Sequence, residues 1–447
     1  MVTSPPVQPP FTIRARVLTP LAAGGTRYER DGRLEVDERG RLASVGPFHP
    51  EPGDDARPPV DLRPLVLLPG LVDLHVHLPQ LPNAGVGAGL HLLDWLERYI
   101  FPLERGFDEA TSERLAPAAC RAFAASGTTT AVMYGAVYEP SLDAAFRAVE
   151  AHGMRAVIGK VMMDRGSYDT RLPPDTILET SLRQSADLCT RWHGKDGGRL
   201  RYAFTPRFAI TSSPDLLRES AALATASGAY WQTHLSEDHD ELDEVARLFP
   251  DAIDYLDVYD RAGALGPRTI LAHSIHLSDR EVGRIAETGT AIAHCPASNL
   301  FLSSGAMPLA HYLGHGIRVG LGSDVGAGPE LSIFANMRAG AYTQSGLHVL
   351  ADGRGPEPLD PLEWLRLATM GGARALGIDG EIGSLEADKE ADMIAVDPRL
   401  VAPVDGIDSD DPAEIMSRLA FRPHADMVRL AWVRGRALDG PPGLAPA

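Results

Sequence analysis

The 447-residue chain is poor in cysteine and has no long apolar run. Its three cysteines, Cys120, Cys189 and Cys295, lie far apart, and their odd number favours a reducing compartment over a disulfide framework. No stretch reaches about eighteen uninterrupted apolar residues, and the N-terminal segment MVTSPPVQPPFTIRARV lacks a hydrophobic region of the signal-peptide type. We therefore expect a cytoplasmic protein with no membrane partner.

Positive charge is also in deficit. Forty-two Lys and Arg residues stand against 60 Asp and Glu, which leaves a formal net charge of −18. Such a chain repels phosphate backbones, and no basic groove offsets that, so we expect no nucleic-acid partner. Because 44% of the residues are hydrophobic, the chain can bury a large core, and its length favours one large domain with a smaller one.

Eight short apolar runs alternate with segments of helical character. The runs are GLVDLHVH (70–77), TTTAVMYG (128–135), RAVIGKVMMD (155–164), RYAFTPRF (201–208), YWQTHLSE (230–237), TILAHSIHL (269–277), TAIAHCPASN (290–299) and RVGLGSDVG (318–326). Helices are expected between them, for example at 214–227 after the N-cap candidate Ser212-Ser213 and at 279–288 behind Ser278. Eight strands, each followed by a helix, predict an α/β fold of the (β/α)8 TIM-like barrel type.

Both ends of the chain carry a different pattern. Short alternating strands broken by Pro and Gly occupy residues 11–68, and EADMIAVDP (390–398) and MVRLAWVRGRAL (427–438) also have strand character. We therefore predict a small β-sandwich domain built from both chain ends. The predicted division is 1–68 and 380–447 for the two parts of this domain and 69–379 for the catalytic barrel.

The end of the first barrel strand carries a His-x-His pair. Side chains two apart on a strand point to the same face, so His75 and His77 can place two imidazole nitrogens on one metal ion. Such a pair on a strand more often binds no metal. Its position favours the metal interpretation, because the chemistry of a (β/α)8 barrel is built at the C-terminal ends of its strands.

Later strand ends carry the remaining groups that a catalytic zinc site needs. These are His234 and Glu237 in THLSE, His273 and His276 in AHSIHL, His294, and Asp324 in GSD. His75, His77, His234 and Asp324 supply a ligand set typical of zinc, and Glu237 is placed to move protons. Taken alone, His273 is compatible with a packed core histidine and Asp324 with a helix N-cap, but the convergence of five strand ends favours a site.

Several motifs together resemble the amidohydrolase superfamily, in its mononuclear deaminase branch. PGLVDLHVH, the HxxE after the fifth run, AHSIHL and GSD mark the superfamily. A narrower similarity, to the guanine deaminases, rests on HLPQ (77–80), LLDWLERYIFPLE (92–104), GTTTA (127–131), GKVMMDR (159–165), TPRF (205–208), AHCPASNL (293–300) and ATMGGARALGIDGEIG (368–383).

The resemblance implies a set of roles. One Zn2+ per subunit is implied on His75, His77, His234 and Asp324, with Glu237 as proton shuttle and with His273 and Asp324 orienting the attacking water. Guanine is implied as the substrate, contacted by Gln80, Arg207, Phe208 and His234, and converted to xanthine and ammonia in purine catabolism or salvage. A homodimer is implied as well.

Some alternatives stay open at this point. A deaminase or chlorohydrolase of a related heterocycle, such as 8-oxoguanine or an aminotriazine, shares the same metal centre, and Gln80 and Arg207 discriminate between them. A non-catalytic scaffold is disfavoured because no ligand is missing. Trp95 and Leu92 either cover the pocket or pack on the barrel. Binuclear relatives use a carboxylated lysine at a strand end, and Lys160 is expected inside a strand, so we expect one ion.

Overall fold

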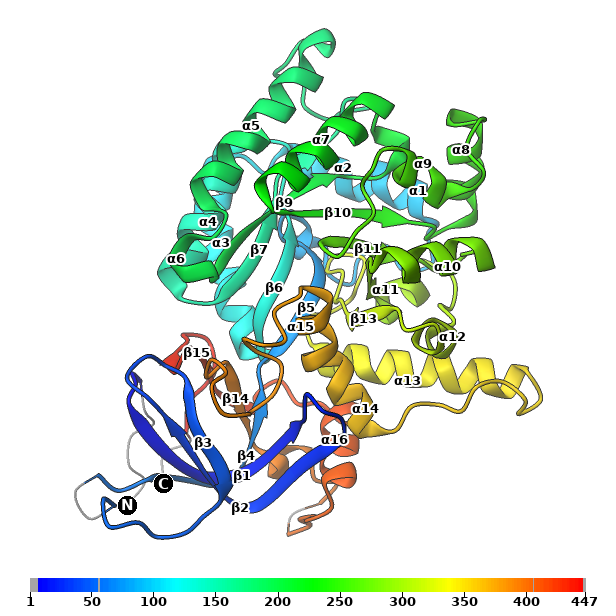
Figure 1. Ribbon diagram of the computed structural model, residues 1–447. Coiled ribbons are helices and arrows are strands. Elements are labelled where there is room, and N and C mark those ends of the chain that lie inside the picture. Colours follow the sequence, from blue (N-terminus) through cyan, green and yellow to red (C-terminus); the bar gives the residue numbers. More distant parts are fainter. Residues whose placement is uncertain (1–6, 55–56, 405, 445–447) are drawn as a thin grey trace.

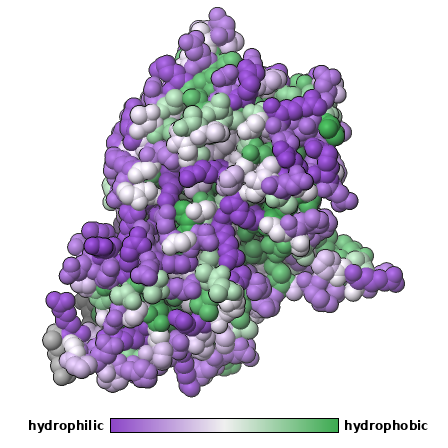
Figure 2. Space-filling view, viewed as in Figure 1, coloured by the Kyte–Doolittle hydropathy of each residue, from purple (hydrophilic) through white to green (hydrophobic). Residues whose placement is uncertain are grey.

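The computed structural model describes residues 7–54, 57–404 and 406–444. It contains two β-sheets, a parallel barrel surrounded by helices and a second sheet at its foot in which the two ends of the chain meet (Figure 1). Hydrophilic residues cover most of the face in Figure 2, with hydrophobic residues scattered between them. No helix in the described part of the chain is long and apolar enough to cross a membrane.

Eight parallel strands form the barrel in the order of the sequence. They are β5 (Leu71–His77), β6 (Thr128–Tyr134), β7 (Arg155–Gly159), β9 (Leu200–Pro206), β10 (Tyr230–Leu235), β11 (Thr269–His273), β12 (Ala291–His294) and β13 (Arg318–Leu321), with the short β8 (Val161–Met162) paired to β9. The ring is closed by backbone bonds from Asp324 N–H to His75 O (2.8 Å) and from His77 N–H to Val325 O (3.2 Å). The predicted fold class is confirmed.

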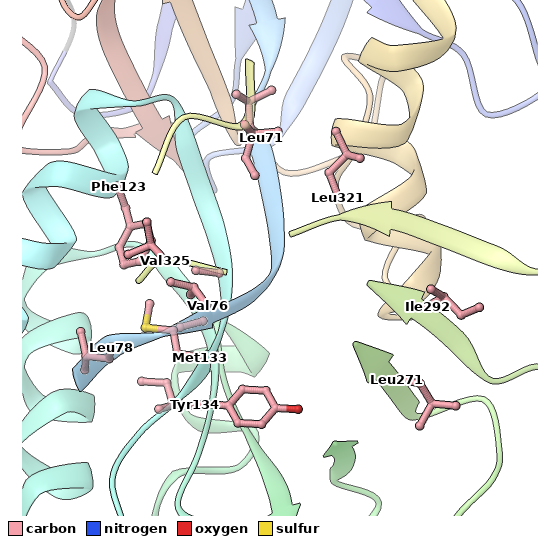
Figure 3. Packing of buried hydrophobic residues seen from close by; sticks show 14 of the residues in the cluster. Leu71, Val76, Leu78, Phe123, Met133, Tyr134, Leu271, Ile292, Leu321 and Val325 are labelled. Atoms are coloured by element: carbon pink, nitrogen blue, oxygen red, sulfur yellow. The ribbon is translucent and has the colours of Figure 1, made fainter. Parts of the chain in front are cut away.

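Helices cover the outside of the barrel. The longer ones are α3 (Glu109–Ala125), α4 (Glu139–His152), α5 (Ile177–Trp192), α7 (Pro214–Ser227), α8 (His239–Leu248), α9 (Tyr255–Arg261), α10 (Asp279–Thr288) and α13 (Ile333–Leu350). The helix α16 (Pro412–Phe421) instead packs against α13 and α14 (Pro361–Arg366), beside the second sheet (Figure 1). The predicted N-caps are confirmed: the Ser213 hydroxyl accepts the Leu216 N–H, and Ser278 forms a capping box with Glu281. Figure 3 shows Phe123 of α3 packed beside Val76 and Met133.

The barrel interior is filled at its N-terminal end. One buried cluster takes Val72, Tyr230 and Ile270 together with side chains of four other strands, so it occupies the space inside the barrel. Residues 373–382 close that end, and the Tyr230 hydroxyl donates to Leu376 O at 2.7 Å. The interior is therefore closed at this end, and the ligand-type side chains described below lie at the opposite, C-terminal end of the barrel.

The second sheet has seven strands. Its order is β16 (Arg436–Ala437), β15 (Val428–Val433), β14 (Met393–Val396), β4 (Val60–Pro69), β1 (Phe11–Pro20), β2 (Thr26–Val36) and β3 (Leu42–Pro47); only β1 and β4 run parallel. Alternate residues of β4 face opposite ways: Leu65 and Leu67 join the core of this sheet, whereas Val66 and Leu68 pack toward the barrel. The domain boundaries given above stay a prediction.

Three of the predicted strands are clearly too long. The runs 269–277 and 318–326 are extended only to His273 and Leu321, so His276 does not lie on the sixth strand. The run 290–299 is extended only to His294, and α11 (Pro296–Phe301) begins two residues later. Pro296 stands at the first helical position, where its fixed φ and missing N–H suit a helix start. This early turn brings Ser298 and Asn299 next to the strand ends, which matters for the site below.

Candidate active site

Four ligand-type side chains meet at the C-terminal end of the barrel, and we call them the ligand ring: His75, His77, His234 and Asp324. Candidate ligand atoms of His75, His77 and His234 lie within 4.8 Å of one another, as do those of His75, His273 and Asp324. His77 Nε2 is 3.1 Å from His234 Nε2. Asp324 Oδ1 is 3.1 Å from His75 Nε2 and 3.6 Å from His77 Nε2.

The sequence reaches this geometry through irregular strand ends. The pairing of β5 with β6 shifts between Asp73 and Val76, so Val72 and Leu74 fill the barrel interior while His75 and His77 face the site. His273 (φ 65°) and Asp324 (φ 47°) have left-handed backbone conformations. Residues other than glycine rarely adopt this region, and such strain is typical of functional sites.

Asp73 ties the first and last strands together. It is fully buried and accepts the Ser323 N–H at 2.9 Å, the Ser323 hydroxyl at 2.5 Å and the His75 N–H at 3.2 Å. Burial raises its pKa to about 6, against the lowering effect of these hydrogen bonds. Gly322 is required here because a Cβ at this position would lie 2.8 Å from the Cβ of His75. The GSD motif therefore aligns Asp324 with the histidines.

The imidazoles are neutral and correctly oriented for metal binding. His234 Nδ1 donates to the carbonyl of Arg207 at 2.6 Å, which leaves Nε2 with its lone pair toward the ring. Burial and neighbouring imidazoles hold the pKa values of His77 and His234 well below the ordinary value. Neutral nitrogens beside an ionised carboxylate are the state that a metal requires.

Unpartnered atoms show that these residues fit a metal ion. The Nε2 atoms of His75 and His273 are buried and form no hydrogen bond with any described residue. Both face the Asp324 carboxylate, at 3.1 Å and 3.8 Å. Buried polar atoms are normally satisfied, and a cation held by the three imidazoles and the carboxylate of the ligand ring would satisfy His75 Nε2. The site is therefore a candidate metal centre.

Glu237 and His273 stand beside the ligand ring. Glu237 follows β10, and its Oε2 lies 3.3 Å from His273 Nε2. Burial and the Asp324 carboxylate raise the pKa of Glu237 well above its ordinary value. Burial also acts to raise the pKa of Asp324, but His75, His273 and the Ser298 hydroxyl together lower it. Two carboxyls with pKa values shifted in opposite directions provide a protonated group at Glu237 and an ionised carboxylate at Asp324.

One short segment, 298–304, holds all three of these groups. The Ser298 hydroxyl donates to Asp324 Oδ2 at 2.6 Å, and Asn299 Oδ1 lies 2.9 Å from His273 Nδ1. The Ser304 hydroxyl donates to Glu237 Oε1 at 3.2 Å. Sequence reasoning did not assign Ser298, Asn299 or Ser304 a role. The AHCPASNL motif contains the first two, and their place just after the seventh strand was the available signal.

A pocket of about 360 Å³ opens onto this centre. It is lined by His77, Gln80, Leu92, Trp95, Leu96, Arg207, Phe208, His234, Glu237, Glu241, His273, Leu302, Asp324 and Ala327. A strap of three short helical pieces, α1 (Leu92–Trp95), η2 (Leu96–Ile100) and α2 (Phe101–Arg105), forms one wall. Leu92 and Trp95 line the pocket and also pack against Phe208 and Leu302. They therefore cover the pocket and at the same time pack on segments that follow barrel strands.

The predicted purine-binding residues lie in this wall with one unforeseen partner. Gln80 and Phe208 line the pocket, and the Arg207 guanidinium lies 5.3 Å from the centre of the Phe101 ring. Between Gln80 and Arg207 stands the buried carboxylate of Glu104, which sequence reasoning missed. Its only signal was its place at the end of the LLDWLERYIFPLE motif.

Two further polar residues lie apart from the pocket. His276 Nε2 lies 2.8 Å from Ser304 O, and His276 is not among the lining residues. Contrary to the expectation that it lies inside a strand, Lys160 directly follows the end of β7. It is buried and donates to Ser181 Oγ at 2.9 Å. No lysine is among the described residues that line the pocket. A single ion stays a prediction.

Fold and site together define a metal-dependent hydrolase of the barrel type. The chain belongs to the amidohydrolase family, whose model matches residues 66–438.

Within that family, the chain is similar to several guanine deaminases. The chain is 38% identical to a probable guanine deaminase of Deinococcus radiodurans over 378 residues, 83% of each chain. It is 37% identical to the guanine deaminase of Escherichia coli over 404 residues, 89% of this chain and 88% of that one. The crystal structure of a guanine deaminase from C. acetobutylicum with bound guanine superposes with a TM-score of 0.89 at 27% identity, covering 96% of this chain and 99% of that one.

Proposed function

We propose that this chain catalyses the hydrolytic deamination of guanine, which gives xanthine and ammonia. The observation that carries the proposal is the shared pocket: Gln80, Arg207 and Phe208 line the same cavity as Glu237 and part of the ligand ring. The similarity to guanine deaminases over more than four fifths of the chain supports the choice of substrate.

Zinc is the ion we propose for the ligand ring, with His75, His77, His234 and Asp324 as its ligands. Three imidazole nitrogens and one carboxylate suit zinc better than the oxygen-rich sites of magnesium or calcium. When bound, zinc supplies the Lewis acidity that lowers the pKa of a water molecule to about 7.

Glu237 moves the protons of the proposed reaction. Ser304 holds its Oε1, so Oε2 is the oxygen that faces the site. From there Glu237 takes one proton from the attacking water and gives it to the ring nitrogen beside the carbon that bears the amine. The water oxygen bonds to that carbon, Glu237 and Asp324 carry the second proton to the amine, and ammonia leaves.

The purine is oriented by the wall of the pocket. The Arg207 guanidinium suits the carbonyl edge of guanine, and the Gln80 amide suits a ring nitrogen. Phe208 offers an aromatic ring beside His234, with ring centres 6.4 Å apart. These contacts place the amine-bearing carbon toward Glu237 and exclude water from the ring faces.

A homodimer and a cytoplasmic location stay predictions.

The test uses the purified, zinc-loaded protein and guanine, with xanthine formation followed by ultraviolet absorbance. 8-Oxoguanine, an aminotriazine, adenine and cytosine are run in parallel. We expect guanine to be consumed fastest. Loss of another heterocycle with guanine untouched, at full zinc occupancy, would keep the metal centre and overturn the substrate assignment.

A further inference from the structure

Glu104 is a buried carboxylate that the proposed reaction does not use. It lies on α2, at the end of the strap, and none of its surface is exposed. It is not among the residues that line the pocket. A buried carboxylate is costly unless it is paired and hydrogen-bonded, so its position needs an explanation.

Its partners are Gln80 and Arg207, two of the proposed purine-binding residues. We call Gln80, Arg207 and Phe208, together with Glu104, the purine-binding wall. Glu104 Oε1 accepts the Gln80 Nε2 amide at 2.8 Å, and Oε2 accepts Arg207 Nη1 at 2.5 Å. The carboxylate thus bridges a residue just after the first barrel strand and a residue just after the fourth. The Tyr168 hydroxyl is buried, and burial together with the Glu104 charge raises its pKa.

The bridge fixes which atom of Gln80 meets a ligand. An ionised carboxylate only accepts hydrogen bonds, so the amide nitrogen of Gln80 must face Glu104. Its oxygen, Oε1, is then left over; it is buried and has no partner among the described residues. Gln80 therefore offers the pocket an acceptor, which matches a ring N–H rather than an unprotonated ring nitrogen.

The bridge also cancels a charge. The Arg207 side chain is 3% exposed, and it forms a salt bridge with Glu104, whose side chain is 0% exposed. Without that carboxylate, a buried cation would face the pocket alone and would attract anions. With it, the pair is neutral overall, while the remaining guanidinium N–H groups still donate to a carbonyl oxygen.

We propose that Glu104 is a positioning and specificity-determining residue, which makes the pocket select a neutral lactam purine over an anionic purine. It does so by holding Gln80 as an acceptor and by balancing Arg207. This inference rests on the proposed function, since it assumes that the pocket binds purines.

The test compares Glu104→Gln with the wild type and with Glu97→Gln, which makes the same chemical change at an exposed position of the same strap. KM and kcat are measured for guanine, and binding of urate, a monoanion at neutral pH, is measured by calorimetry on zinc-loaded protein. For Glu104→Gln we expect KM to rise about 10- to 100-fold and urate to bind about tenfold more tightly. Glu97→Gln should match the wild type in its KM for guanine and in its affinity for urate.

A purely structural role for Glu104 gives a different result. If the variant only loosened the pocket, guanine and urate would both bind more weakly, and that outcome overturns the proposal. Glu104→Asp keeps the charge but shortens the side chain, so it should raise KM while leaving urate binding within about twofold of the wild type. If Glu104→Gln does not fold, tighter urate binding by Glu104→Asp overturns the proposal in its place.

The failure of this inference can be told apart from the failure of the proposed function. A wild-type protein that binds guanine but does not deaminate it contradicts the proposed function and leaves the binding comparison intact. A wild-type protein that deaminates guanine, with variants that show unchanged preference between guanine and urate, contradicts the inference alone.

Discussion

The ligand ring and the purine-binding wall share one pocket, but the chain builds them differently. The ring takes its histidines from β5 and β10 and Asp324 from just after β13, where the barrel backbone fixes each position. The wall takes Gln80, Glu104 and Arg207 from segments that follow strands or form the strap, and side-chain hydrogen bonds fix their positions. If the proposed function holds, the chemistry is set by the barrel and the specificity by contacts between segments that the barrel only brings near.

Arg207 belongs to both regions through different atoms. Its carbonyl accepts the Nδ1–H of His234 and so supports the ligand ring. Its guanidinium pairs with Glu104 and supports the wall. Side-chain substitutions in the wall leave the carbonyl in place, so the two regions can be disabled separately.

The largest expected effect comes from the proton carrier between the two regions. Glu237→Gln keeps the shape of the side chain but removes proton transfer, so kcat should fall by about 10⁴-fold. Zinc content, measured by metal analysis, should stay at the wild-type value because Glu237 is not a proposed ligand. Asp243→Asn, an exposed change on α8, is the matched control. Wild-type turnover in Glu237→Gln would remove Glu237 from the mechanism.

A second prediction concerns pH and the support beneath Glu237. Glu241 accepts the Glu237 N–H and the Tyr255 hydroxyl, each at 2.8 Å, and burial with the nearby Glu237 raises its pKa to about 7. The folded state therefore binds this proton more tightly than the unfolded state. The contribution of Glu241 to the free energy of unfolding should be greatest below about pH 4.5 and fall by up to about 3 kcal/mol as the pH rises to about 7.

Denaturant titrations across that pH range isolate the contribution of Glu241. Because other groups titrate too, the useful quantity is the difference between the wild type and Glu241→Gln at each pH. That difference should shift in favour of the variant as the pH rises from about 4.5 to about 7, and stay flat above. A difference independent of pH would show that Glu241 has the same pKa in both states.

The ligand ring was predictable from the sequence because barrel strands have a simple rule. Groups at the C-terminal ends of parallel strands share one face, so His75, His77, His234 and Asp324 were expected together, and the structure brings them together. The shift within β5 was not predictable. Alternation alone puts His75 on the same face as Asp73, and only the observed pairing with β6 explains how both can be used.

The wall was predictable only where a family motif names a residue. Gln80, Arg207 and Phe208 came from the resemblance, whereas Glu104 and Asn299 were missed. Glu104 meets Arg207 across 103 positions in the sequence, and no local period or propensity encodes an ion pair at that separation. Asn299 was missed because the seventh run predicts a strand up to residue 299, whereas α11 begins at Pro296.

A third prediction separates the regions through Arg207. Arg207→Lys keeps the charge and the carbonyl but loses the planar fork, so kcat/KM for guanine should fall by about 50-fold, mainly through KM. Zinc affinity, measured by competition with a chelator, should not change because the carbonyl still orients His234. Loss of zinc from this variant would mean that ring and wall are not independent. Arg98→Lys, an exposed change on the strap, is the control.

The smallest expected effect tests whether segment 298–304 serves the ring or the wall. Asn299→Ala removes the acceptor of His273 Nδ1, so the imidazole loses its fixed tautomer, and kcat should fall about tenfold with KM nearly unchanged. A change in the pH profile of kcat should accompany the loss, because the orientation of His273 beside Glu237 is altered. Asn299→Asp restores an acceptor and should recover part of kcat. A rise in KM without a change in kcat would place Asn299 in the purine-binding wall, since His273 touches the proton carrier and not the edges of the purine.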